Sequence, residues 1–285
     1  MSADLHCHSK YSDGSTAVDE LVLLAKCKGL DTISVTDHDT FKGSQKAAEF
    51  GVKYGVRVIQ GTEISCFDFV RKRKVHLLCY MPAVTERLSD MLQATCLRRQ
   101  QAMTDSVQKV MSVCPIPYDM ILRRSAGSTT LYKQHVMQAL MDAGYTDRVF
   151  GELFKELFNS KNGIAKISIE YPDVFEALKL VKESGGVAVL AHPAVYNSYD
   201  VMMEMIEQGL DGIEVSYPRA KESDENELSQ ICQRYNLIKT GGTDFHGMNT
   251  SRINPIGTCT TNEEELNKLI TLAESRGYND SKVKS

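Results

Sequence analysis

Six of the seven histidines lie beside acidic residues at the expected ends of β-strands. His6 and His8 form an H-x-H pair, and Thr36-Asp37-His38-Asp39 closes a second strand. The remaining three are His76, His192 and His246. Neutral imidazoles and carboxylates are the usual protein ligands of Zn, Mn and Fe. So many of these groups at the ends of buried strands predict a centre that holds more than one metal ion.

Short apolar runs alternate along the chain with amphipathic helical patterns. The expected strands are residues 3–8, 32–36, 56–64, 74–80, 187–191, 211–216 and 237–242. The expected helices are residues 17–28, 40–54, 172–184, 199–208, 221–235 and 262–276. This alternation is typical of an α/β protein with a parallel sheet, and seven strands with helical returns predict a closed barrel.

The alternation stops between residues 84 and 168, where no buried strand is expected. The patterns there predict helices at residues 85–112, 117–124, 130–143 and 146–158. Consecutive helices pack on each other, so we expect residues 84–168 to form an inserted helical subdomain. Residues 1–83 and 169–285 would then form the barrel. An insertion at the active end of a barrel usually acts as a lid or a specificity element.

Composition narrows the possible partners and the location. The chain has 285 residues and a net charge of −4, which gives no reason to expect binding to double-stranded nucleic acid. No apolar run approaches the roughly 20 residues of a membrane span, and no signal-peptide pattern is present. Eight cysteines lack C-x-x-C spacing, which favours a reducing compartment. We expect a cytoplasmic protein with no membrane contact and no obligate protein partner.

The geometry of strands explains why these residues point to a metal. Residues i and i+2 of a strand face the same side, so His6 and His8 project together. His192 ends an apolar strand that Pro193 prevents from continuing. Asp244 and His246 follow a Gly-Gly pair that allows a tight turn. Active sites of barrels lie at the C-terminal ends of strands, which is where all of these residues are expected.

Several of the acidic and histidine positions also have ordinary structural interpretations. Asp13 is a common turn residue, and Asp39 is a possible N-cap of the next helix. Asp37 is a possible outer partner that orients an imidazole. A lone histidine in an apolar strand, such as His76, is usually a core residue, but the neighbouring strand carries Glu63. The metal interpretation is favoured because one site explains all of these positions.

The set H-x-H, T-D-H-D, Glu63, His76, A-H-P and G-G-T-D-F-H-G resembles the PHP (polymerase and histidinol phosphatase) family of metal-dependent phosphoesterases. Within that family the chain is most similar to nucleoside 3′,5′-bisphosphate phosphatases and RNA 5′-to-3′ exonucleases. The resemblance runs through essentially the whole chain. It implies a distorted (β/α)7 TIM-like barrel with an inserted helical subdomain and two or three divalent ions (Mn, Zn or Fe).

The resemblance also implies how the ligands are shared among three metal sites. Site one would comprise His6, His8, Glu63 and Asp244; site two Glu63, His76 and His192; site three Asp13, His38 and His246. Glu63 would bridge sites one and two. Asp13 stands where several relatives have histidine, which favours Mn or Fe over Zn in site three. The attacking water would be held by metals bound to Glu63, Asp13, His38 and His192.

The insertion is expected to recognise the substrate. Related sequences carry an Arg-rich helix and then a G-R-P-H-like segment, and this chain has Lys133 and Gln134 in place of the usual Arg and Pro. The candidate phosphate or substrate contacts are Arg98, Arg99, Lys133, His135 and Arg219. Each has a plain alternative as a surface or packing residue. His135 is the seventh histidine and lies in the insertion, away from the expected metal ligands.

These features predict a phosphoesterase that releases the 3′-phosphate of a nucleoside 3′,5′-bisphosphate, or acts on a 5′-nucleotide or a short RNA end. A histidinol-phosphate phosphatase is the alternative with the same metals. A metal-binding regulatory module without catalysis is the alternative of another class. An amidohydrolase shares barrel metals but usually shows a carboxylated lysine, and no lysine is expected at a strand end.

Overall fold

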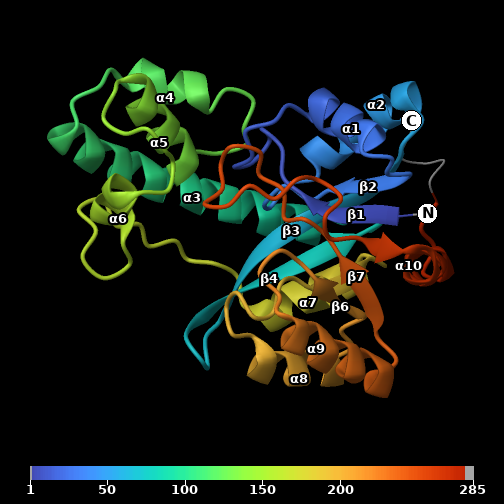
Figure 1. The fold of residues 1–285 in the computed structure, drawn as a ribbon. Coiled ribbons are helices and arrows are strands. Elements are labelled where there is room, and N and C mark those ends of the chain that lie inside the picture. The colour runs from blue at the N-terminus through green and yellow to red at the C-terminus, as the bar shows by residue number, and fades with distance from the viewer. Residues whose placement is uncertain (1, 280–285) are drawn as a thin grey trace.

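A mixed eight-stranded sheet curves into a nearly closed barrel in the computed structural model, which describes residues 2–279 (Figure 1). The sheet order is β7-β6-β5-β4-β3-β2-β1-β8. The strands are β1 (Ser2–Cys7), β2 (Thr32–Val35), β3 (Arg57–Asp68), β4 (Arg73–Tyr80), β5 (Val187–Leu190), β6 (Gly212–Ser216), β7 (Ile238–Gly241) and β8 (Thr261–Asn262). The expected α/β barrel is confirmed, and the seven expected strands are all present.

The eighth strand, which the sequence did not predict, narrows the gap between β1 and β7. It pairs antiparallel with β1, with Ala3 opposite Thr261. The Thr261 hydroxyl accepts a 2.8 Å hydrogen bond from the main chain of Gly241 at the end of β7. Beyond these strands, the N–H of His8 donates to the carbonyl of Phe245 at 2.8 Å. The first and last segments of the barrel are therefore joined next to the residues expected to bind metal.

The sheet is not wholly parallel, and this part of the prediction was wrong. β4 runs antiparallel to both β3 and β5. β3 and β4 form a hairpin, and its short connection leaves no room for the crossover that a parallel pair requires. β3 also continues to Asp68, so Glu63 lies within the strand and not at its end. The reversed direction of β4 pairs His76 with Ser65, two residues beyond Glu63, which itself pairs with Leu78.

Six helices surround the barrel close to their expected positions. They are α1 (Val18–Cys27), α2 (Lys42–Tyr54), α7 (Val174–Glu183), α8 (Tyr199–Glu207), α9 (Glu222–Tyr235) and α10 (Glu263–Ser275). α7 shows why such segments form helices here. Val174, Ala177, Leu178 and Val181 repeat at helical spacing and are buried against the sheet. The carboxylate of Asp173 caps the helix by accepting from the N–H of Phe175 at 2.9 Å.

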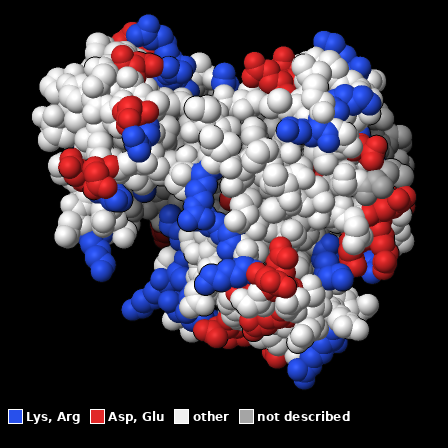
Figure 2. Space-filling view, in the orientation of Figure 1, with Lys and Arg blue, Asp and Glu red and all other residues white. Residues whose placement is uncertain are grey.

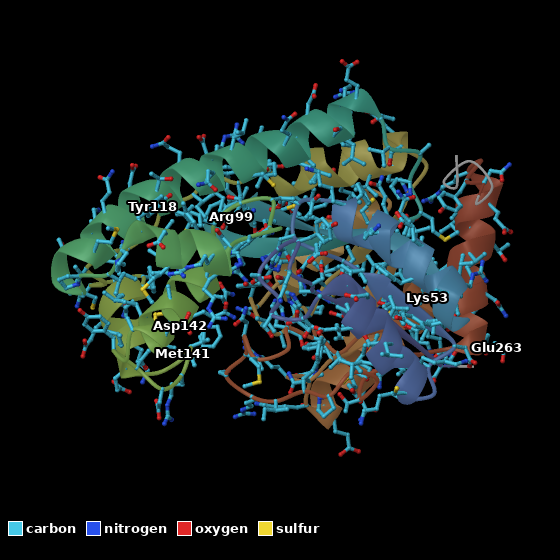
Figure 3. All side chains as sticks on the ribbon, turned by 90° about the horizontal axis from the view of Figure 1, so that it is seen from above. Lys53, Arg99, Tyr118, Met141, Asp142 and Glu263 are labelled. Carbon is cyan, nitrogen blue, oxygen red and sulfur yellow. The ribbon has the colours of Figure 1, made fainter. Side chains whose placement is uncertain are left out.

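The segment between β4 and α7 is helical, as expected, with α3 (Glu86–Val113), α4 (Tyr118–Arg124), α5 (Lys133–Asp142) and α6 (Glu152–Phe158). Seen from above, the long α3 runs from the barrel out to the other three helices (Figure 3). Its Leu88 packs in the barrel core, whereas Met103 and Val110 belong to a separate apolar cluster shared with α5 and α6. The domain boundaries at residues 84 and 168 stay predictions.

The last insertion helix is shorter than expected because residues 146–151 are not helical. The Thr146 hydroxyl donates to the carbonyl of Arg148 at 3.1 Å. Such a local bond competes with the helical hydrogen-bond ladder. α6 therefore begins at Glu152.

The surface of the molecule is hollowed between the insertion and the barrel. Lys and Arg side chains gather in this hollow (Figure 2), although the chain as a whole carries a net charge of −4. A local positive field of this kind attracts anions. Among the helices of residues 2–279, we find none with the length and apolar character needed to cross a membrane.

Candidate metal centre

Four predicted ligands converge at the end of β1. The Nε2 atoms of His6 and His8 lie 3.2 Å apart, as expected for alternate residues on one strand face. Glu63 Oε2 lies 3.2 and 3.1 Å from these two atoms. Asp244 Oδ1 lies 3.5 and 3.4 Å from them. The ligand atoms of all four residues fall within 4.8 Å of one another, so the structure brings predicted site one together.

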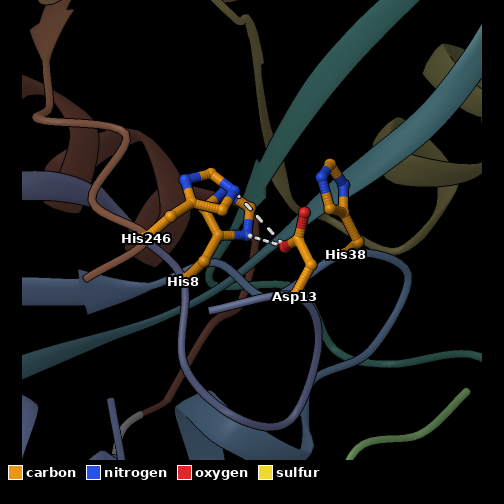
Figure 4. A group of neighbouring side chains, drawn as sticks. All are labelled: His8, Asp13, His38 and His246. Carbon is orange, nitrogen blue, oxygen red and sulfur yellow. Dashed lines mark ion pairs between the residues drawn. The ribbon is translucent and has the colours of Figure 1, made fainter. Parts of the chain in front are cut away.

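The predicted ligands of site three form a second group, to which the structure adds His8. Asp13 Oδ1 lies 3.3 Å from His246 Nε2 and 3.6 Å from His8 Nδ1, and His38 faces the same carboxylate from the other side (Figure 4). The two ring nitrogens of His8 therefore face different groups, with Nε2 toward Glu63 and Nδ1 toward Asp13. This shared position was not expected from the sequence.

The predicted ligands of site two meet at the other oxygen of Glu63. Glu63 Oε1 lies 2.6 Å from His76 Nδ1 and 2.9 Å from His192 Nε2. His38 also approaches this group, with Nδ1 3.4 Å from Glu63 Oε2. Because Oε1 and Oε2 face different imidazoles, the carboxylate has the arrangement that a bridging ligand requires.

The backbone adopts unusual conformations to deliver two of these side chains. His192 has φ of 27° and Asp244 has φ of 48°, in the left-handed region that residues other than glycine seldom occupy. Such residues cost about 1–3 kcal/mol each and cluster at functional sites. Gly242 is needed for a different reason, since a Cβ there would lie 2.3 Å from the Cβ of His6. Backbone strain at His192 and Asp244 and the close approach at Gly242 thus occur at or next to candidate ligands.

The neighbouring imidazoles favour the ionised form of the buried carboxyls in the candidate centre. Burial raises the pKa of the Glu63 and Asp13 carboxyls, but the surrounding imidazoles outweigh it and hold both values below the usual range. Burial lowers the pKa of His8, whereas its contacts with Asp244 and Glu63 raise it to about 10. Three carboxylates and six imidazoles thus form a donor set that fits divalent Zn, Mn or Fe.

Glu214 is a candidate functional residue that the sequence analysis missed. Its Oε1 lies 2.9 Å from His6 Nδ1, and its Oε2 accepts a 2.8 Å bond from the main-chain N–H of His192. A carboxylate on the outer nitrogen of a ligating imidazole fixes the ring and its tautomer. The available signal was a single carboxylate within the apolar strand β6, because a buried carboxylate requires partners.

Comparison with known proteins places this centre in a family. A family model described as "PHP domain" matches residues 4–188. The chain belongs to the PHP domain family. It is 37% identical over 254 residues to the phosphoribosyl 1,2-cyclic phosphate 1,2-diphosphodiesterase of Eggerthella lenta. The aligned region covers 87% of this chain and 95% of that protein. It is 24% identical to the 3′,5′-nucleoside bisphosphate phosphatase of Chromobacterium violaceum, covering 85% of this chain and 86% of that protein.

A solved structure from Bifidobacterium adolescentis, described there as a proposed metal-dependent phosphoesterase, matches with a TM-score of 0.88. The match has 29% identity and covers 98% of both chains. The resemblance to the PHP family is therefore confirmed, and the protein is a metal-dependent phosphoesterase of that family. The alternative of a non-catalytic module is not supported.

Two aspartates of the PHP centre have roles other than those expected. Asp39 was expected as an N-cap, but α2 begins later and its N-cap is Phe41. Asp39 instead accepts from the N–H of Ser65 at 2.9 Å and from Arg99 at 2.5 Å. Asp37 accepts a 2.6 Å bond from the Ser12 hydroxyl, which lies 3.5 Å from His8 Nδ1. Asp37 is thus linked to the imidazole of His8 through the hydroxyl of Ser12.

A pocket opens beside the candidate ligands, and one of the five expected substrate contacts lines it. Asp13, His38, Glu63, His76 and His192 contribute to its walls, together with Arg219. Arg98 is exposed on α3 and does not line the pocket. Arg99 is buried and bonds to Asp39 and to the Ser65 hydroxyl at 3.0 Å. The structure thus places Arg219 in the pocket beside the candidate metal ligands, whereas Arg99 bonds to Asp39 and Ser65.

The two remaining expected contacts, on α5, also do not line this pocket. Lys133 Nζ lies 5.6 Å from the ring centroid of Phe158, and burial together with Lys74 lowers its pKa to about 8. His135 is 2% exposed, and its Nδ1 accepts from the N–H of Tyr132 at 3.2 Å. The imidazole of His135 therefore caps the start of α5.

His135 gives a pH prediction. Burial lowers its pKa to about 4, from an unfolded value of 6.5, so the unfolded chain binds more protons between these values. Stability is therefore present above pH 6.5 and lost as pH falls toward 4. His135→Gln keeps an acceptor for the Tyr132 N–H but does not titrate. Urea unfolding of the metal-free proteins should show that wild type loses about 2 kcal/mol more than the variant between pH 7 and pH 5. Equal losses would contradict this.

Proposed function

We propose that the protein hydrolyses phosphoester bonds of a small sugar phosphate, with a phosphoribosyl 1,2-cyclic phosphate as the first substrate to test. The observation that carries this proposal is the chemistry of the pocket beside the candidate metals. Besides the candidate ligands and several apolar and aromatic residues, its lining includes uncharged polar side chains and one Arg and no Lys among the described residues, namely Gln134, Asn249, Thr250, Ser251, Asn254 and Arg219. The hydroxyls of Thr250 and Ser251 and the amide of Asn254 suit the hydroxyl groups of a sugar. The relative at 37% identity carries the same substrate in its name.

The chain's own residues supply binding and orientation. The three candidate groups, which share the carboxylates of Glu63, Asp13 and Asp244, would hold two or three divalent ions, which when bound polarise a phosphate and lower the pKa of water. Arg219, which lines the same pocket, would contact the phosphate oxygens. In a cyclic phosphate, one water adds to phosphorus as one ring P–O bond breaks, leaving a monoester. A second water then releases inorganic phosphate.

A nucleoside 3′,5′-bisphosphate is the second candidate substrate, favoured by one observation. Phe150, Tyr196 and Tyr217 line the same pocket, and aromatic rings stack well on a nucleobase. The Chromobacterium violaceum relative named for this substrate is 24% identical. However, Arg98, Arg99 and Lys133 do not line the pocket, so the positive charge expected for a second phosphate is reduced there.

An assay of four substrates tests the proposal. The Mn-loaded protein is given phosphoribosyl 1,2-cyclic phosphate, adenosine 3′,5′-bisphosphate, histidinol phosphate and 5′-phosphorylated RNA, and phosphate release is measured. We expect kcat/KM to be highest for the cyclic sugar phosphate, by at least about tenfold. A higher value for the bisphosphate would favour the second candidate, and one for histidinol phosphate would refute both.

Arg219→Ala tests the assignment of the pocket. A hydrogen bond to a charged group contributes about 1.5–3 kcal/mol, so kcat/KM should fall about 10- to 100-fold while bound metal is unchanged. Arg98→Ala is the matched control, because Arg98 is exposed on α3 outside the pocket. Equal effects of the two substitutions would show that the pocket is not where the phosphate binds.

A further inference from the structure

We propose that Gln134, on helix α5 of the insertion, is a positioning residue for the third metal site, which rests on the proposed metal centre. Its Nε2 donates a 2.7 Å hydrogen bond to Asp13 Oδ2. The other oxygen, Oδ1, faces His246 Nε2 at 3.3 Å and His8 Nδ1 at 3.6 Å. One oxygen is thus held by the amide, and the other is left for a cation.

A second amide from the same helix holds the same loop. Gln138 Nε2 donates to Asn249 Oδ1 at 2.7 Å, and Asn249 Nδ2 donates to the carbonyl of Asp13 at 2.7 Å. Gln134 and Gln138 are four residues apart, so they lie on one face of α5. The helix therefore fixes both the side chain of Asp13, directly, and its main chain, through Asn249.

The uncharged nature of Gln134 matters to the ion. A lysine in its place would hold Asp13 as an ion pair but would cancel the negative charge that attracts a cation. A leucine would leave the Asp13 carboxylate, which is 5% exposed, without this donor. An amide orients the carboxylate and leaves its charge in place.

One consequence is that the insertion and the third site are linked. Binding of an ion at Asp13 favours the position of α5 in which Gln134 reaches the carboxylate. By reciprocity, any change that moves α5 away from Asp13 lowers the affinity of the third site for its ion. The insertion would then contribute to the metal centre as well as to the pocket wall.

The test measures metal binding directly. Gln134→Leu and Gln134→Lys are titrated with Mn²⁺, and bound ions per chain are counted by mass spectrometry after dialysis. Loss of an outer partner usually costs 10- to 100-fold in metal affinity, so we expect one ion, that of the third site, to lose that much in both variants. The other ions should bind as in wild type. Gln101→Leu, at an exposed position on α3, is the control and should match wild type.

The outcomes separate this inference from the proposed function. Unchanged affinity for every ion in both variants would overturn the role of Gln134. A wild-type protein that binds no Mn²⁺, Zn²⁺ or Fe²⁺ would instead overturn the metal centre itself. Thermal unfolding in EDTA checks that the variants fold. If Gln134→Leu does not fold, Gln134→Lys still decides, because its ammonium can donate to Asp13 while it adds a positive charge beside the site. A uniform loss of all ions would show general damage and would also overturn the inference.

Discussion

Glu63→Gln is expected to reduce hydrolysis by at least about 1,000-fold and to remove bound metal. Both carboxylate oxygens are in use, with Oε2 toward His6 and His8 and Oε1 toward His76 and His192. Glutamine keeps the shape but loses the charge, and it turns an N–H₂ group toward one set of imidazoles. Phosphate release and metal content by mass spectrometry are the measurements.

The control for this variant is Glu183→Gln, because Glu183 ends α7 at the surface and pairs only with Arg87 among the interactions described for residues 2–279. It should keep full metal content and activity. Glutamine keeps the size of the side chain but loses the charge that the neighbouring imidazoles hold ionised, so thermal unfolding in EDTA checks that Glu63→Gln is folded. A variant that retains its metal and its rate would show that Glu63 does not bridge the centre.

Those parts of the metal centre that depend on local geometry were predictable from sequence. His6 and His8 share one face of β1. His192 and Asp244 follow the C-terminal ends of β5 and β7, which lie at the same end of the barrel. The parts that depend on distant partners were not. Glu214 meets His6 across 208 residues, and no local pattern specifies such a pairing. The sharing of His8 between two groups depends on the ring orientation, which spacing does not determine.

The fold was predictable to a similar extent. Hydrophobic periodicity located the strands and helices, but it does not encode strand direction, so the antiparallel β4 was missed. β8 has two residues, too few to show a period. Asp39 was misinterpreted because a polar residue before a helix is typical of an N-cap. Its true partner, Arg99, lies 60 residues away on α3.

The ion pair between Arg99 and Asp39 is the basis of the second prediction with a large expected effect. Arg99→Met should lower the free energy of unfolding by about 3–5 kcal/mol, because it leaves the Asp39 carboxylate buried without its cation. Arg99 is 4% exposed and Asp39 is 2% exposed, so water does not replace the lost partner of the Asp39 carboxylate. Arg99 also bonds to the hydroxyls of Ser65 and Tyr132, which joins α3 to β3 and to the start of α5. Urea unfolding of the metal-free protein is the measurement.

The double variant Arg99→Met with Asp39→Asn separates two explanations of that loss. If the cost comes from the unpaired charge, the double variant should recover most of it, because asparagine still accepts from the Ser65 N–H and tolerates the φ of 56° at this position. The Cζ atom of Arg99 lies 4.9 Å from the ring centroid of Tyr132. If the cost comes from losing this packing, the double variant should have no higher free energy of unfolding than Arg99→Met alone. The second result would mean that Arg99 joins the insertion to the barrel by contact rather than by charge.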